Sequence, residues 1–213
     1  MKIKICGLFR DEDIDFVNEA RPDYAGFVFA KSPRQVSTAL AQFLRFRIAE
    51  GITPVGVFVN APIPLIVELY QNGVISMAQL HGDEDESYVA QLKKQSAGSI
   101  RQTQVQPIKV IKTIIYTNIK PKIPLPNSAD YILLDSGAGS GKTFDWKKFQ
   151  ILSTKRPWFL AGGLNINNID KAMELNPFAV DVSSGVETDG VKDRKKIVEL
   201  VRAVRQAEAR KNK

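Results

Sequence analysis

Cysteine and histidine are scarce in this sequence, with one of each among 213 residues. A single cysteine excludes an internal disulfide and leaves no plausible metal site built on cysteines. No pair of histidines or carboxylates has the spacing of metal ligands either. The sequence therefore predicts chemistry that uses neither a metal nor a cofactor.

Long apolar runs and linker-like stretches are also missing. No run approaches the roughly 18 apolar residues that a membrane helix needs, and no signal-peptide h-region follows Met1. No Gly/Ser-rich or low-complexity stretch divides the chain. We therefore expect a cytoplasmic protein without membrane contact, folded as a single domain over residues 1–213 and frayed after about residue 208.

Most of the positive charge lies near the C-terminus. The formal net charge is +7, and residues 192–213 hold nine Lys or Arg against three Asp or Glu, which gives +6. Apolar residues recur at helical spacing in this stretch, namely Ile197, Leu200, Val201 and Val204. This spacing predicts a helix with one packed face and one solvated basic face. We therefore expect no nucleic-acid partner, and we expect a monomer.

Eight short β-branched or aromatic runs recur along the chain at spacings of 21 to 31 residues. They begin near Ile3, Tyr24, Val55, Met77, Ile108, Tyr131, Trp158 and Ala179. Helical patterns with polar caps lie between or after them, at 11–20, 38–50, 62–72, 87–95, 144–152, 168–175 and 193–208. The gap at 116–129 contains three prolines and predicts a loop or a single helical turn. This alternation predicts an α/β fold, a single-domain (β/α)8 TIM barrel with eight parallel strands.

The last two predicted strands each end in a loop of small residues. One loop is Gly162-Gly163-Leu164 and the other is Ser183-Ser184-Gly185-Val186. Without Cβ atoms, main-chain N–H groups can crowd around an anion. A βα barrel places its phosphate site after its seventh and eighth strands. The two loops therefore predict a split phosphate site.

The C-terminal ends of the strands should form the mouth of the barrel, where active sites lie. Cys6 ends the first predicted strand and Asp135 ends the sixth. A thiolate can accept a proton and a neutral carboxylic acid can donate one, so the pair could move hydrogen across a substrate without a cofactor. The surroundings must shift the pKa of each group, since at pH 7 a free thiol is only about 3% ionised and a free Asp is almost wholly charged. Taken alone, a cysteine is more often a small buried hydrophobe, and an Asp at a strand end is a turn or helix cap about as often as not.

The segment Gly137–Thr143 suggests a competing hypothesis, a nucleotide-binding P-loop. The motif G-x-x-x-x-G-K-[ST] requires a glycine at the position of Ser136. Asp145 is better explained as the cap of a following helix. The sequence therefore argues against a nucleotide triphosphatase.

Eight segments in order along the chain carry a resemblance to a known family. They are Lys4–Leu8, Gly26–Phe29 with Ser32–Arg34, Val55–Asn60, Gln79–Gly82, Leu133–Asp135, Gly139–Trp146, Ala161–Asn165 and Asp181–Glu187. In these segments the sequence resembles phosphoribosylanthranilate isomerase of tryptophan biosynthesis. Eight matches in the family's order make the resemblance specific over the whole chain.

The resemblance implies an enzyme, an intramolecular aldose-ketose isomerase. Its reaction is the Amadori rearrangement of N-(5′-phosphoribosyl)anthranilate, a small phosphosugar, to 1-(2-carboxyphenylamino)-1-deoxyribulose 5-phosphate. By this similarity Asp135 protonates the furanose ring oxygen, Cys6 takes the proton from C2′, and Arg34 binds the anthranilate carboxylate. The resemblance also assigns His81 and Asp181 to the substrate site, and Gly162, Gly163, Ser184 and Gly185 to the phosphate loops. His81 would orient its neighbours, whereas Asp181 would be structural or sugar-binding.

The sequence departs from the family pattern at three positions. Phe9 stands where Thr is common, Thr113 where a small Ala is usual, and Ala138 where a glycine is often found. These departures bear on loop packing and substrate affinity. Two other functions stay open: an aminoaldose isomerase of histidine synthesis, which would have an Asp where Cys6 stands, and a non-catalytic protein that binds anions or nucleic acid through its basic helix.

Overall fold

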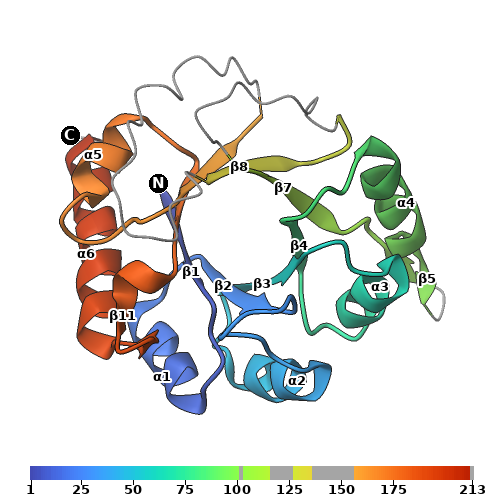
Figure 1. Ribbon diagram of the computed structural model, residues 1–213, viewed down its shortest axis with the longest axis horizontal. Coiled ribbons are helices and arrows are strands. Elements are labelled where there is room, and N and C mark those ends of the chain that lie inside the picture. The colour runs from blue at the N-terminus through green and yellow to red at the C-terminus, as the bar shows by residue number, and fades with distance from the viewer. Residues whose placement is uncertain (101–102, 116–126, 136–155, 212–213) are drawn as a thin grey trace.

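The computed structural model describes residues 1–100, 103–115, 127–135 and 156–211. Its parallel strands form a closed barrel in the order β1-β10-β9-β8-β7-β4-β3-β2 (Figure 1). They are β1 (Lys2–Cys6), β2 (Tyr24–Val28), β3 (Thr53–Phe58), β4 (Met77–Leu80), β7 (Lys109–Ile115), β8 (Tyr131–Asp135), β9 (Trp158–Ala161) and β10 (Ala179–Val182). The predicted barrel is confirmed, and every strand begins within two residues of its predicted start.

The first strand closes the barrel by pairing with a neighbour on each side. In β1, Lys4 is aligned with Tyr24 of β2 and with Asp181 of β10. This register places the C-terminal ends of β1, β2 and β10 at one rim. Residues near the two ends of the chain therefore meet beside Cys6.

The helices of the described residues lie on the outside of the barrel (Figure 1). They are α1 (Asp11–Ala20), α2 (Thr38–Arg47), α3 (Ile63–Gln71), α4 (Glu86–Ser96), α5 (Ile169–Glu174) and α6 (Arg194–Lys211). Polar caps set some of their starts: Ser37 Oγ accepts from the amide of Leu40 at 3.1 Å, and Asp85 caps α4 in the same way. α2 ends three residues before the predicted Glu50, whereas α6 continues past residue 208, after which we predicted fraying.

Two short hairpins were not predicted. One consists of β5 (Gly98–Ile100) and β6 (Thr103–Val105), and the other of β11 (Glu187–Thr188) and β12 (Val191–Lys192). Asp189 and Gly190 form the second turn, with φ values of 51° and 80°, which suits the Asp-Gly turn of a tight hairpin. The register of this hairpin pairs Glu187 directly with Lys192.

Some predicted features lie outside the described residues. They are the helix at 144–152, the P-loop-like segment Gly137–Thr143 and most of the predicted loop at 116–129.

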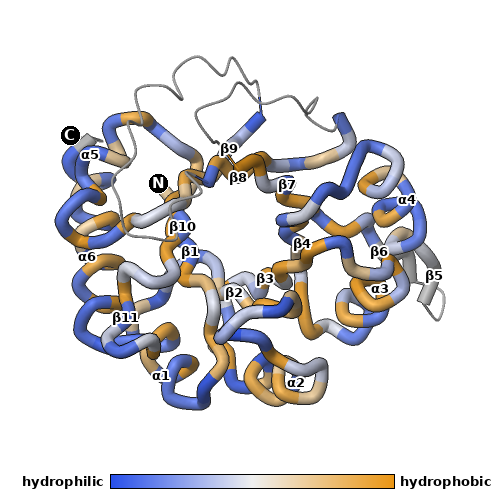
Figure 2. Tube along the Cα trace, viewed as in Figure 1, coloured by the Kyte–Doolittle hydropathy of each residue, from blue (hydrophilic) through white to orange (hydrophobic). Residues whose placement is uncertain are grey.

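Hydrophobic residues form two layers, because side chains alternate between the two faces of each strand. The layer inside the barrel contains Tyr24, Val55, Met77, Ile111, Leu133, Phe159, Ala161 and Ala179. The larger layer lies between strands and helices and includes the predicted apolar face of α6, with Ile197, Leu200, Val201 and Val204. Figure 2 shows hydrophobic positions along the strands and both kinds of residue on the helices. Inward-facing residues closer to the C-terminal ends of the strands are not part of this inner layer and can line a site.

Candidate active site

A cavity of about 430 Å³ lies at the C-terminal ends of the barrel strands. Its walls include every residue predicted for the site, namely Cys6, Arg34, His81, Asp135, Gly162, Gly163, Asp181, Ser184 and Gly185. Closure of the barrel thus brings together residues that lie far apart in the sequence.

Cys6 is the last residue of β1 and is 9% exposed. A Cβ at Gly26 would lie 2.9 Å from its Sγ, so glycine at that position leaves room for the thiol. Burial raises the pKa of the Cys6 thiol above its ordinary value, while the charge of Lys4 acts to lower this pKa. At neutral pH the resting thiol is therefore largely protonated, and its ionisation depends on nearby cations.

Lys4 and Asp181 form a buried ion pair beside Cys6. Lys4 Nζ donates to Asp181 Oδ2 at 2.8 Å, and the two side chains are 0% and 7% exposed. Burial acts to lower the pKa of Lys4, but Asp181 and Cys6 outweigh it and hold this pKa above its ordinary value. Lys4 is therefore cationic.

Sequence analysis assigned no role to Lys4. A signal was present: Lys4 lies two residues before Cys6, so both side chains are on one face of the strand. A charged residue at an inward position of a barrel strand is unusual unless it is paired.

His81 lies between Gln79 and Asp135. Its Nε2 is 3.8 Å from Oδ2 of Asp135, and its Nδ1 is 3.3 Å from the side-chain nitrogen of Gln79. The Gln79 amide thus contacts Nδ1, and Nε2 faces Asp135. Burial lowers the pKa of His81, although the Asp135 charge opposes this effect. The ring is therefore neutral at pH 7 and suited to orienting the Asp135 carboxylate.

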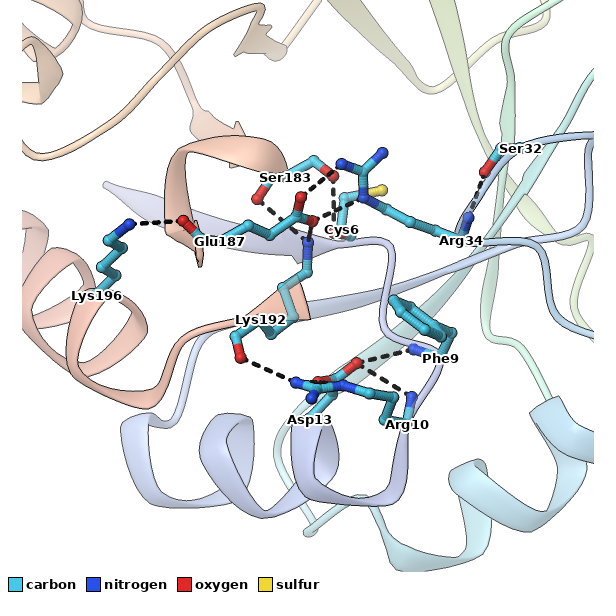
Figure 3. A network of polar contacts seen from close by, with 10 residues as sticks. All are labelled: Cys6, Phe9, Arg10, Asp13, Ser32, Arg34, Ser183, Glu187, Lys192 and Lys196. Carbon is cyan, nitrogen blue, oxygen red and sulfur yellow. Dashed lines mark hydrogen bonds and ion pairs between the residues drawn. The ribbon is translucent and has the colours of Figure 1, made fainter. Parts of the chain in front are cut away.

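Glu187 holds Arg34 in a bidentate ion pair (Figure 3). Arg34 Nε donates to Oε1 at 2.7 Å, and Nη2 donates to Oε2 at 2.5 Å. This pairing leaves the end-on edge of the guanidinium, formed by Nη1 and Nη2, for a ligand. Burial acts to raise the pKa of Glu187, but the hydrogen bonds from Arg34 and Lys192 outweigh it and lower this pKa. The carboxylate is therefore ionised.

Further contacts connect this ion pair to the Cys6 backbone (Figure 3). Lys192 Nζ donates to Glu187 Oε1 and also to the carbonyl of Ser183 at 3.2 Å. Ser183 Oγ in turn donates to the carbonyl of Cys6 at 3.1 Å. Sequence analysis gave Glu187 and Lys192 no role in the site, although Glu187 ends the segment Asp181–Glu187 and Lys192 begins the basic stretch.

The two loops of small residues have backbones that require glycine. Gly162 and Gly163 have φ values of 96° and 64°, a region that glycine adopts without strain. A Cβ at Gly185 would lie 1.8 Å from the carbonyl oxygen of Leu164, so the loops after β9 and β10 pack directly together. The side-chain amides of Asn165 and Asn168 donate to the Gly163 carbonyl at 3.2 and 2.9 Å, which fixes the first loop.

Two of the departures from the family pattern, Phe9 and Thr113, are not among the residues that line the cavity. Phe9 packs partly buried against the core, and its amide donates to Asp13 Oδ2 at 3.0 Å. Thr113 is 5% exposed, and among the described residues its Oγ1 has no hydrogen-bond partner. Ala138 lies outside the described residues.

Within the described ranges, no group of three or more His, Cys, Asp or Glu side chains could hold a metal ion. No helix in that part of the chain is long and apolar enough to cross a membrane.

Comparison with known proteins assigns the family. Residues 3–203 match the family described as N-(5′-phosphoribosyl)anthranilate (PRA) isomerase. A relative of that name from Endomicrobium trichonymphae is 46% identical over 210 residues, which cover 96% of this chain and 98% of the relative. The chain belongs to this family.

Solved structures of phosphoribosylanthranilate isomerases share the fold. TrpF from Jonesia denitrificans is 32% identical with a TM-score of 0.82, over 98% of both chains. A phosphoribosylanthranilate isomerase in complex with reduced 1-(o-carboxyphenylamino)-1-deoxyribulose 5-phosphate is 30% identical with a TM-score of 0.78, over 97% of this chain and 99% of that one. The family resemblance and the barrel predicted from the sequence are both confirmed.

Proposed function

We propose that this isomerase of tryptophan biosynthesis uses Asp135 as its general acid and Cys6 as its general base. Its family catalyses the Amadori rearrangement of N-(5′-phosphoribosyl)anthranilate. The observation that supports the two roles is their position: both residues line one cavity, from strands three places apart around the barrel. A substrate between them can receive a proton on one side and lose one on the other.

The reaction proceeds in two proton transfers. Asp135 gives its proton to the furanose ring oxygen, and the bond between that oxygen and C1′ breaks to form a Schiff base with the anthranilate nitrogen. Cys6 thiolate then takes the proton from C2′, the C–H electron pair becomes the C1′=C2′ double bond of an enolamine, and the π electrons of the C1′=N bond move to the nitrogen. Tautomerisation of the enolamine gives the ketone. Both transfers are general acid–base steps without covalent attachment of the sugar.

Arg34 binds the carboxylate of the anthranilate ring in this proposal. A guanidinium can hold a carboxylate through two parallel hydrogen bonds. Because Glu187 occupies the Nε side, the substrate carboxylate uses the end-on edge. Glu187 thus fixes the direction from which the ring enters.

The loops after β9 and β10 bind the substrate phosphate through Gly162, Gly163, Ser184 and Gly185. The positive φ values of Gly162 and Gly163, together with the close approach of Gly185 to Leu164, support a rigid concavity without side chains. A related isomerase binds a reduced product that carries a 5-phosphate. Main-chain N–H groups in such a concavity are typical donors to phosphate.

His81 and Asp181 complete the substrate site in this proposal. His81 lies beside the acid Asp135, with Nε2 3.8 Å from Oδ2, and orients it. One oxygen of Asp181 holds Lys4, and the other, buried and without a hydrogen-bond partner among the described residues, is suited to accept from a sugar hydroxyl.

We further propose a cytoplasmic monomer, folded as one domain over residues 1–213 and without a nucleic-acid partner. Several basic residues of the C-terminal segment contact other parts of the chain. Arg194 pairs with Glu19 at 2.6 Å, and Arg205 pairs with Asp23 at 2.8 Å. These contacts leave less free charge than the sequence suggests.

Fluorescence of freshly made phosphoribosylanthranilate during turnover tests the acid and the base. We expect Asp135→Asn and Cys6→Ser each to lower kcat by about 10² to 10⁴, because each removes one proton-transfer group. Asp189→Asn makes the same change as Asp135→Asn at an exposed turn and should leave kcat unchanged. Near wild-type kcat in folded Asp135→Asn and Cys6→Ser proteins would exclude these roles.

A further inference from the structure

A buried thiol is a poor base unless something stabilises its anion. The ordinary thiol pKa of about 8.5 leaves only about 3% thiolate at pH 7. Burial of Cys6 raises that pKa further. The proposed base therefore needs a compensating positive charge within the barrel.

Lys4 is in the position to supply this charge. It lies two residues before Cys6 on the same strand, so both side chains are on one face. A Cβ at Gly26 would lie 2.9 Å from Cys6 Sγ and 3.2 Å from Lys4 Cε, so the two side chains come together beside Gly26. The Lys4 side chain is 0% exposed, and in an interior of low dielectric its charge acts strongly on its neighbours.

Charged groups from three further segments also act on the thiol. Asp181 on β10 disfavours the thiolate, whereas Lys192 on β12 favours it, and Arg34, after β2, also interacts with Cys6. Glu187 binds both Arg34 and Lys192 (Figure 3). The group beside the sulfur thus has three cations, on Lys4, Arg34 and Lys192, and two carboxylates, on Asp181 and Glu187. Its net charge is +1. The negative charge of a thiolate would bring the net charge of this group to zero. His81 and Asp135 form a separate pair elsewhere in the cavity wall.

We propose that Lys4 is a positioning residue for the reaction: its buried ammonium, held by Asp181, stabilises the Cys6 thiolate that accepts the proton. This inference rests on the proposed role of Cys6 as the base. In it, Asp181 has two opposing effects, since it fixes the ammonium and partly cancels its charge. Removal of Lys4 should therefore make Cys6 less acidic, whereas removal of Asp181 should make it more acidic.

Titration of the thiol tests this inference without any substrate. Cys6 is the one cysteine of the chain, so iodoacetamide alkylation followed by intact mass reports on it alone. The midpoint of the rate against pH measures the thiol acidity, and the high-pH plateau measures access. We expect the midpoint to rise in Lys4→Met and to fall in Asp181→Asn. At a fixed pH below the midpoint, alkylation of Lys4→Met should be about tenfold slower or more, because a nearby opposite charge shifts a pKa by one unit or more.

A double variant guards against misfolding, because Lys4→Met leaves a lone buried carboxylate. Lys4→Met/Asp181→Asn removes both charges, and its midpoint should lie between those of wild type and Lys4→Met. The matched control is Lys112→Met, which breaks the buried pair of Lys112 with Glu84, 2.8 Å apart on another strand. Its midpoint should equal that of wild type.

The outcomes separate the inference from the proposed function. The inference is overturned if Lys4→Met and the double variant both have the wild-type midpoint. It is also overturned if the midpoint rises as much in Lys112→Met as in Lys4→Met. If Cys6→Ser is nevertheless inactive in the isomerase assay, the role of Cys6 as base stands. If Cys6→Ser is active, the proposed function fails and the inference fails with it. In the supported case, the acidic limb of kcat/KM in Lys4→Met moves to higher pH together with the thiol midpoint.

Discussion

Arg34 presents one defined edge to the cavity because Glu187 occupies the other. The pairing is bidentate, and a second cation, Lys192, keeps the carboxylate ionised. Arg34 keeps its position and its remaining donors without the substrate present. Pre-organisation of this kind lowers the entropy lost when a ligand binds.

Arg34→Ala should therefore weaken only the contact with the ring carboxylate of the substrate. A hydrogen bond to a charged group is worth about 1.5 to 3 kcal/mol, so kcat/KM for phosphoribosylanthranilate should fall by roughly 10- to 150-fold. With an analogue that lacks the ring carboxylate, the same substitution should have little effect. Steady-state kinetics on both compounds measure this difference, and equal losses on both would contradict a carboxylate contact.

At the scale of single elements, the loop after β9 is fixed by backbone conformation and by the two asparagine amides. Gly163→Asp places a side chain at a φ of 64° and adds negative charge where the phosphate would bind. We expect KM to rise severely while the fold is kept, as measured by kinetics and circular dichroism. Gly73→Asp, at a φ of 70° in an open turn away from the cavity, is the control. An unchanged KM in Gly163→Asp would remove this loop from the phosphate site.

The junction between α4, β7 and β8 depends on one carboxylate. Asp130 Oδ2 accepts from the amide of Val110 and from Lys93 Nζ, both at 2.9 Å. Burial acts to raise the pKa of Asp130, but these hydrogen bonds and the charges of Lys93 and Lys109 outweigh it and lower this pKa. The ionised carboxylate therefore stabilises the folded state.

Asp130→Asn should destabilise the protein in a pH-dependent way. A charged hydrogen bond contributes about 1.5 to 3 kcal/mol, so the free energy of unfolding in urea at pH 7 should fall by a similar amount. Because the folded pKa lies below the ordinary value of about 3.9, the contribution is complete above that value and is lost as pH falls through the folded pKa. The difference between wild type and variant should therefore shrink below about pH 4. If wild type and variant differ in the free energy of unfolding by the same amount at pH 7 and below about pH 4, the loss of stability comes from packing and not from charge.

At the scale of the whole molecule, the charge of +6 counted for residues 192–213 is partly balanced by acidic side chains from elsewhere in the chain. Lys192, Arg194 and Arg205 are each paired with an acidic side chain, and Lys196 donates to the main-chain carbonyl of Glu187. We expect no binding of duplex DNA tighter than about 10⁻⁴ M at physiological salt, measured by fluorescence anisotropy. Tighter binding that weakens steeply with salt would contradict this expectation.

The expected monomer of 23.7 kDa is tested by sedimentation velocity. Phe43 and Phe46 on α2 are 55% and 92% exposed, and they are the place where an apolar contact between copies would form. A concentration-independent monomer supports the proposal. A dimer that Phe46→Ser dissociates would contradict it and identify the interface.

The sequence by itself determined the features that depend on local physics. Each barrel strand is a short apolar run, and each is visible in its own window of residues. The absence of a side chain allows Gly162 and Gly163 to adopt their positive φ values. The candidate site residues could be located in the same way, because they lie at the ends of predictable strands or in the segments that follow them, and the family resemblance supplied their roles.

Only the tertiary structure decided which charges neutralise one another. Lys4 and Asp181 are 177 residues apart in the sequence, and Arg34 and Glu187 are 153 apart. Both pairs exist because β1 closes against β10 in a particular register and because the β11–β12 hairpin turns back toward the rim. Electrostatic interactions depend on distance and burial rather than on sequence separation. For that reason the partners Asp181 of Lys4 and Glu187 of Arg34 were found only when the barrel closed, although the nearness of Lys4 to Cys6 on one strand is local.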